Sequence, residues 1–239
     1  MENIFIILIL ILFLASFVQG LSGFGFQLVA LPLLSIFINI KEAIPLAALC
    51  GYMVNIYLII SLRQHIKIFT LKRLIAGAVV GIPIGAYFLA SADPVLVEHI
   101  LGVFIVGFVA LNYFKIIKQI NLNVNWGYLF GLVSGLLGGA FNTNGPPIII
   151  YFYLQGMNKE ELKASITGYF IFTSTLIVLS HLISGVATID TYITFVKTIP
   201  FVLLGIVSGN YIFKRINTGV YNFVILIILF LLGISLLFR

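Results

Sequence analysis

The sequence predicts an all-α polytopic membrane protein with two inverted-topology repeats, each made of a broken or re-entrant helical hairpin followed by three transmembrane helices. Three observations predict this fold class. Of the 239 residues, 62% are hydrophobic and only 8% are charged, whereas soluble domains carry about 25% charged residues. The apolar runs are long enough to cross a bilayer as helices. Glycine-rich breaks recur at similar places in the two halves of the chain.

The same composition argues against several other classes of protein. Thirteen Lys/Arg and seven Asp/Glu residues cannot cover a soluble enzyme or a nucleic-acid-binding module with charge. Intrinsic disorder needs low hydrophobicity, and a β-barrel needs shorter alternating segments. Catalytic groupings and phosphate-binding loops are not evident, and the single Cys50 cannot form an intramolecular disulfide. We therefore expect no enzymatic activity, no metal, no cofactor and no nucleic-acid partner.

The first repeat is expected to cover residues 1–120. It opens with a hairpin over residues 4–38, because a glycine-rich break at Gly20–Gln27 interrupts the apolar run. The entering arm of this hairpin is long enough that it could span by itself. Three runs follow that approach the roughly 20 residues of a spanning helix. They cover residues 43–62, 71–90 and 95–114.

The second repeat is expected to cover residues 121–239. Its hairpin, residues 126–154, has two arms that are each too short to span, and a Gly/Asn/Pro break separates them. Such a pair is typical of a re-entrant hairpin, in which irregular backbone lies at membrane depth but is buried in protein. The three spans that follow cover residues 162–183, 191–213 and 220–238.

Internal similarity between the halves indicates a duplication. Segments of the first half recur in the second at offsets of 115, 118 and 124 residues. These segments are Gly20–Pro32, Lys41–Glu42 and Gly81–Tyr87, which match Gly135–Pro147, Lys159–Glu160 and Gly205–Tyr211. Chance is the alternative, since glycine and apolar residues are common in this chain, but the three matches keep the same order.

Loop charges predict how the repeats are oriented. Ten of the thirteen Lys/Arg residues fall on one predicted side, which should be the cytoplasmic side. They are Arg63, Lys67, Lys72, Arg73, Lys115, Lys118, Lys159, Lys163, Lys214 and Arg215. Equivalent loops of the two repeats then lie on opposite sides of the cytoplasmic membrane, so the repeats are inverted. The N-terminus is expected on the outer side of this membrane. Inverted repeats are common in secondary transporters, with a substrate site near the midplane, but channels also use this plan.

The break of the second hairpin is the strongest candidate site. Asn144 is a good N-cap residue and Pro146 suits a first helical turn, so a short helix should begin there with its N-terminus inside the membrane. Such a terminus attracts anions. The expected ligands are the loop N–H groups of Asn142 to Gly145 and the side chains of Asn142, Thr143 and Asn144. Pro146, which has no N–H group, is counted with them as part of the substrate-binding tip. Alternatively, the polar residues only cap the broken helix.

Further candidates come from the first break and from the helix after the second. Gly25, Phe26 and Gln27 lie in the first break, where Gln27 takes the place of Asn142 at the offset of 115. Phe24 and Phe26 either form a gate or simply pack. Tyr151 could reach a ligand from the short helix. We expect the two tips to meet around one small anion near the midplane.

The two breaks, the Asn144-Gly145-Pro146-Pro147 entry to a short helix and the chain length resemble the sulfite exporter TauE/SafE family, also called the toluene-sulfonate uptake permeases. The resemblance covers nearly the whole chain and is strongest over Gly131–Lys163. It implies transport of small sulfur-containing anions such as sulfite, sulfoacetate or sulfonates. Phe24 and Phe26 depart from the glycine-richer first break that is common in the family.

Scattered charged groups complete the candidates. Lys197 corresponds to Arg73 at the offset of 124, and the two either attract anions at opposite mouths of a pathway or snorkel to headgroups. Ionisable residues near the predicted outer ends could serve proton coupling, although an interfacial position is the simpler reading. They are Glu98, His99, His181 and Asp190. The sequence thus predicts a secondary transporter for a small anion, with a passive channel or a scaffold subunit as alternatives, and leaves open the coupling proton or ion and the oligomeric state.

Overall fold

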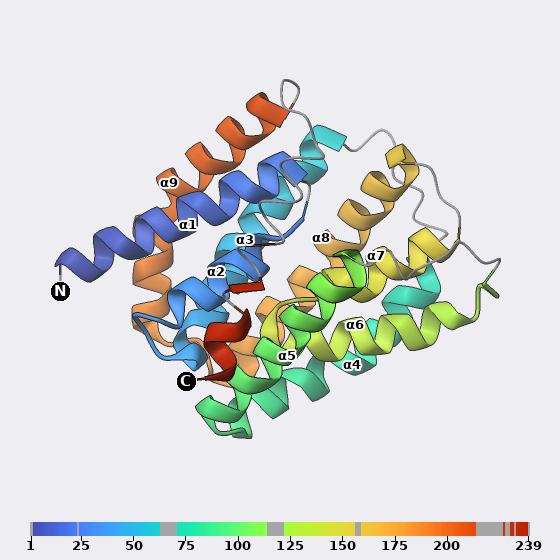
Figure 1. Cartoon of the computed structure of the whole chain (residues 1–239), viewed down its shortest axis with the longest axis horizontal. Coiled ribbons are helices and arrows are strands. Elements are labelled where there is room, and N and C mark those ends of the chain that lie inside the picture. Colours follow the sequence, from blue (N-terminus) through green and yellow to red (C-terminus); the bar gives the residue numbers. More distant parts are fainter. Residues whose placement is uncertain are drawn as a thin grey trace. The chain divides into compact units, whose positions relative to one another are not determined.

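The computed structural model contains helices and no strands in the part of the chain that it describes (Figure 1). The described residues are 2–22, 24–62, 71–113, 122–155, 159–213, 227, 230–231 and 233–238. The helices are α1 (Glu2–Ser22), α2 (Phe26–Leu34), α3 (Ile40–Leu62), α4 (Lys72–Ser91), α5 (Pro94–Tyr113), α6 (Trp126–Phe141), α7 (Gly145–Leu154), α8 (Lys159–Ile183) and α9 (Ile189–Phe213). These bounds lie within a few residues of the expected elements and confirm the all-α fold class.

Six of the described helices, α1, α3, α4, α5, α8 and α9, are long and apolar enough to cross a membrane. The arms of the second hairpin are shorter, because the 16 residues of α6 and the 10 of α7 extend about 24 Å and about 15 Å at the rise of an α-helix. Neither reaches the roughly 30 Å of a hydrocarbon core. The chain is therefore a multi-pass membrane protein, and that the break between α6 and α7 lies at membrane depth stays a prediction.

Some expectations fall on residues outside the described ones. The last expected span, 220–238, does so for most of its length. Six of the basic residues used for the orientation also do so, which leaves that orientation a prediction. They are Arg63, Lys67, Lys115, Lys118, Lys214 and Arg215.

The described helices form two compact units, and each unit takes helices from both halves of the sequence. Unit 1 contains α1, α2, the first part of α3, α5 and α9. Unit 2 contains the rest of α3 together with α4, α6, α7 and α8. In unit 1, α1 packs along α9, and in unit 2, α4 packs along α6 (Figure 1).

Glycines on facing helices hold α4 and α6 in direct backbone contact. A Cβ atom at Gly81 would collide with the carbonyl oxygen of Leu132, and one at Gly85 would collide with that of Leu136. From the other side, a Cβ at Gly139 would collide with the carbonyl oxygen of Ile82. Small residues allow such close approach between membrane helices, whose association is driven by van der Waals packing and not by the hydrophobic effect.

The same contacts recur between α1 and α9 in unit 1. Gly205 of α9 lies against the Phe13 carbonyl of α1, and this pair corresponds to Gly81 and Leu132 in unit 2. Gly209 lies against the Phe17 carbonyl, and this pair corresponds to Gly85 and Leu136. Position 205 is 124 residues after 81, and position 132 is 119 residues after 13. Gly20 of α1 lies against the Ile206 carbonyl of α9, as Gly139 of α6 lies against the Ile82 carbonyl of α4. Position 139 is again 119 residues after 20, and position 206 is 124 residues after 82. The packing thus aligns α1 with α6 at 119 residues.

This register differs from the offset of 115 that the sequence suggests for the breaks. Glycines recur every four residues at Gly131, Gly135 and Gly139, so a slip by about one helical turn still matches glycine to glycine. The starts of α2 and α7, at Phe26 and Gly145, also differ by 119 residues. At this register Asn142 corresponds to position 23, which lies outside the described residues, and not to Gln27.

Candidate functional site

The second hairpin tip begins with a Schellman-type end to α6. Asn142 adopts the left-handed conformation, with φ 51° and ψ 24°, which asparagine tolerates better than most residues. Its N–H donates to the Gly138 carbonyl at 2.8 Å, and the Thr143 N–H donates to that of Leu137 at 3.3 Å. The Thr143 hydroxyl donates to the Phe141 carbonyl at 2.9 Å. These bonds satisfy the last carbonyls of α6, as such a motif does.

The end of α6 therefore uses two of the four loop N–H groups that were expected to bind a ligand. Those of Asn142 and Thr143 are occupied by carbonyls of α6. The N–H groups of Asn144 and Gly145 remain for a ligand at the start of α7, since Pro146 has none. The capping interpretation is thus confirmed for the backbone of Asn142 and Thr143.

Asn144 is fixed by side chains from two neighbouring helices. The Ser134 hydroxyl of α6 donates to the Asn144 carbonyl at 2.7 Å, and the Asn144 Nδ2 donates to the Thr173 Oγ1 of α8 at 2.7 Å. The Tyr169 hydroxyl in turn donates to the Ser134 Oγ at 2.8 Å. Tyr169 is completely buried. Ser134 and Tyr169 were not singled out from the sequence, and their role is to position the tip.

Removing Ser134 is expected to loosen the tip more than removing the Tyr169 hydroxyl. Ser134→Ala leaves both the Tyr169 hydroxyl and the Asn144 carbonyl unpaired, whereas Tyr169→Phe removes one donor and leaves the bond to Asn144. An unpaired buried group costs about 1–3 kcal/mol, so Ser134→Ala should lower the thermal unfolding temperature in detergent by the larger amount. Tyr128→Phe on the exposed face of α6 is the matched control; equal effects of all three changes would contradict the network.

The side chain of Asn142 has a different environment. Asn142 is 3% exposed, and its Nδ2 is fully buried without a hydrogen-bond partner in the described part of the chain. An unpaired buried amide is costly, and such groups are uncommon unless a ligand or solvent pairs with them. The tip therefore presents a buried amide donor that has no partner among the described residues.

His181 lies beside the same tip, in the last turn of α8. It is 1% exposed, and its Nε2 is 2.7 Å from the Gly139 carbonyl oxygen of α6. Its Nδ1 is buried and has no partner among the described residues. His181 is therefore covered by the close approach of α6 at this end of α8, and its expected position near the membrane interface stays a prediction. Asp190 is exposed and Glu98 and His99 are half-buried.

At the first tip, between α1 and α2, the buried side chain of Gln19 takes the place of a side-chain cap at the start of α2. Gly25 precedes α2 with φ 99°, a conformation that favours glycine. The Phe26 N–H donates to the Gln19 Oε1 at 3.3 Å. Phe26 is completely buried, which favours packing over a gate, and Gln27 is half-buried. Gln19 was missed from the sequence, although a polar residue within an apolar run is a signal for such a role.

Of three other predicted residues, Tyr151 and Arg73 belong to unit 2 and Lys197 belongs to unit 1. The Tyr151 hydroxyl donates to the Val124 carbonyl at 3.3 Å, beside the start of α6 and thus at the end opposite the tip. Arg73 is exposed at the start of α4. Lys197 is exposed in unit 1, with its Nζ 5.7 Å from the centroid of the Phe5 ring, which is within reach of a cation–π contact.

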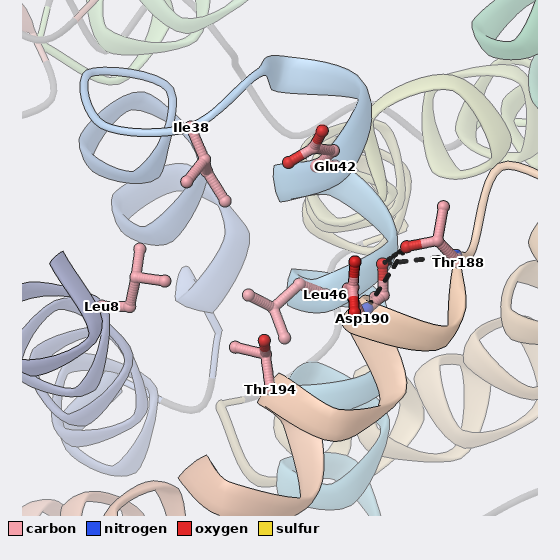
Figure 2. A pocket seen from close by; sticks show the side chains of 8 residues that line it. Leu8, Ile38, Glu42, Leu46, Thr188, Asp190 and Thr194 are labelled. Atoms are coloured by element: carbon pink, nitrogen blue, oxygen red, sulfur yellow. Dashed lines mark hydrogen bonds between the residues drawn. The ribbon is translucent and has the colours of Figure 1, made fainter. Parts of the chain in front are cut away.

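Unit 1 also contains a cavity of about 220 Å³, which Figure 2 shows from close by. Its lining consists of Leu8, Ile38, Glu42, Leu46, Thr188, Asp190, Thr191 and Thr194. Glu42 and Asp190 lie in the first turns of α3 and α9, where a carboxylate is stabilised by the helix dipole. Two carboxylates without a basic residue in the lining repel an anion, so this cavity is a poorer candidate than the second tip.

Comparison with known proteins identifies relatives of the chain. The family model described as "Sulfite exporter TauE/SafE" matches residues 8–236. The chain is also 29% identical over 83 residues to a "Probable sulfite/organosulfonate exporter TauE" of Cupriavidus necator. That match covers 35% of this chain and 32%, about a third, of the length of the relative. No solved structure matches the chain.

Proposed function

This chain belongs to the sulfite exporter TauE/SafE family, and from that premise we propose that it is a secondary transporter for a small sulfur-containing anion in the cytoplasmic membrane. The family consists of transporters rather than enzymes. The name of the relative from Cupriavidus necator refers to sulfite and organosulfonates. These two chemical classes share an oxygen-rich, negatively charged sulfur group, which is the substrate group that we propose.

The observation that carries the proposal is the unpaired Asn142 amide in a tip that Ser134, Tyr169 and Thr173 hold in place. A hydrogen bond to a charged group contributes about 1.5–3 kcal/mol, so one amide and the N–H groups of Asn144 and Gly145 can select an anion. Neither α6 nor α7 contains a charged residue. The anion is thus bound without a countercharge from these helices, which keeps release fast.

Alternating access between two inverted repeats is part of the same proposal. The glycine contacts of α1 with α9 and of α6 with α4 follow one pattern at constant offsets, which supports a duplication. Transporters of this plan keep the substrate site near the midplane, at discontinuous helices. The break between α6 and α7, which Thr173 contacts near the middle of the span Ser165–Ile183, fits that position.

A thermal-shift screen tests the proposed substrate class. The purified protein is heated with sulfite, sulfate, thiosulfate, sulfoacetate or taurine, and with carboxylates as controls. A ligand at 100 times its Kd stabilises the folded state by about 2.7 kcal/mol through mass action. Stabilisation by a sulfur anion supports the proposal; stabilisation by a carboxylate and by none of the sulfur compounds would overturn the substrate class.

Lys197 and Arg73 are expected to respond differently to removal of their charges. We expect Lys197→Ala to slow the initial uptake of the anion, because a cation near the outer end of α9 raises the local anion concentration. Lys197→Arg should restore it. Arg73→Ala should instead lower the amount of protein inserted in the membrane and leave uptake per molecule unchanged. Uptake is measured in proteoliposomes with known protein content, and wild-type rates in both alanine variants would contradict the role of Lys197.

A further inference from the structure

We propose that His181 is the proton-binding group of the transport cycle, and that it takes up one proton at Nδ1 when the anion binds at the second hairpin tip. This inference rests on the proposed function and assigns the coupling ion, which neither the family match nor the curated relative specifies. The proton comes from the water on the side where the anion enters. It returns to the water on the other side when the anion leaves, so nothing is oxidised or reduced.

The hydrogen bond of the ring determines which nitrogen can exchange a proton. A carbonyl oxygen can only accept, so the Nε2 that lies 2.7 Å from the Gly139 oxygen must carry a hydrogen. Nδ1 is then a bare acceptor in the neutral ring and an N–H donor in the charged ring. Since Nδ1 has no partner within the described chain, its protonation does not break an existing bond.

One face of α8 follows the tip and brings His181 to it. Thr173 accepts the hydrogen bond from Asn144. Four residues further on, Ile177 lies against Gly138, where a Cβ would be 3.0 Å from the Ile177 Cδ1. Another four residues on, His181 contacts Gly139. Among the described residues, the two buried side-chain nitrogens without a partner are Asn142 Nδ2 and His181 Nδ1. Asn142 follows the end of α6, and the ring of His181 on α8 contacts Gly139, three residues before Asn142.

The helices around His181 bring no carboxylate to it. α8 packs against α4, α6 and α7, none of which contains Asp or Glu. Their charged residues are Lys72 and Arg73, both exposed at the start of α4. The tyrosines Tyr87 and Tyr128 are 73% and 52% exposed, and the Tyr151 hydroxyl is bonded to Val124. The charged residues of α8 itself, at 159–163, lie about 27 Å or more away along the helix.

A protonated His181 would thus be a buried cation without a counter-charge from the helices described as packing against α8, which is costly. A bound anion would remove that cost, and the protonated ring would in turn offer the anion a second donor and a positive charge. The two binding events therefore favour each other by the same factor, as linkage requires. Histidine is suited to this role because its charge changes near neutral pH.

Proton uptake upon anion binding tests the inference directly. Methanesulfonate or sulfate is added to the purified full-length protein in weakly buffered detergent solution, and a pH dye reports proton uptake while thermal stabilisation reports binding. Both probes stay ionised near neutral pH, so any proton taken up goes to the protein. The wild type should take up a proton per bound anion near neutral pH. Uptake should vanish at low pH, where His181 is already protonated, and at high pH, where it stays neutral.

His181→Gln separates proton binding from the structural role of the ring. The glutamine amide can still donate to the Gly139 carbonyl but cannot titrate. We expect this variant to bind the anion on the order of 10-fold more weakly and without proton uptake, whereas His99→Gln on α5 behaves as the wild type. Equal proton uptake per anion in His181→Gln, or binding to the wild type at every pH without proton uptake, would overturn the inference while the proposed function stands. Absence of stabilisation by any sulfur anion would overturn the proposed function itself.

Discussion

Alanine at position 85 is expected to destabilise the folded protein, although alanine is the better helix former. Helix propensity alone favours Gly→Ala by about 1 kcal/mol. At Gly85, however, the new Cβ would collide with the backbone of Leu136 and approach that of Ala140. Backbone atoms cannot rotate away, so α4 and α6 must separate. Overpacking of this kind costs about 1–3 kcal/mol or more, and the net effect is a loss of stability.

Gly107→Ala is the matched control for this prediction. Gly107 lies on α5, and a Cβ built there meets nothing within 4 Å. The same substitution should therefore leave stability unchanged or raise it slightly. Thermal unfolding of both variants in the same detergent measures the difference. A Gly85→Ala variant that is as stable as the wild type would show that α4 and α6 are not in the direct backbone contact described above.

Asn142→Gly is expected to abolish most anion binding without weakening the fold. Glycine adopts the left-handed conformation of position 142 without strain, so the end of α6 is preserved. The substitution also removes the unpaired buried amide, so the stability of the protein without ligand should be unchanged or higher. Loss of one hydrogen bond to a charged group should weaken anion binding by about 10- to 150-fold.

Asn144→Ala serves as the contrasting variant. It removes the bond to Thr173, so we expect it to lower the unfolding temperature even without ligand. Titration of the anion with thermal stabilisation as the signal distinguishes the two effects. If Asn142→Gly bound the anion as tightly as the wild type, Asn142 would have no place in the binding site, and its amide would have to be explained in another way.

The fold class and the position of the second tip could be predicted from the sequence because both depend on local patterns. Runs of about 20 apolar residues define the spans, and the Asn144–Pro147 segment marks the start of α7. The partners of the tip could not be predicted in this way. Thr173 is 29 residues from Asn144 and Gly139 is 42 residues from His181, so only the packing of α8 against α6 reveals these contacts.

The register between the halves shows a second limit of sequence patterns. Glycines spaced by four residues match each other equally well after a slip of one turn, so the offset of 115 looked as good as 119. The backbone contacts of Gly20 and Gly139 resolve this ambiguity, because a helix crossing depends on which glycine faces which carbonyl. Similarly, the position of His181 near the end of a span does not reveal that a contact with Gly139 buries its side chain.

Counterflow in proteoliposomes tests most directly whether the protein is a secondary transporter. Vesicles containing the purified protein are loaded with unlabelled sulfite and diluted into a trace of radiolabelled sulfite, with thiosulfate and sulfoacetate as parallel substrates. A carrier that alternates access exchanges one anion for another, so we expect the label to accumulate transiently inside loaded vesicles and the rate to saturate with concentration. Flux of the label that never saturates and does not depend on the internal load would identify a passive channel and contradict the account.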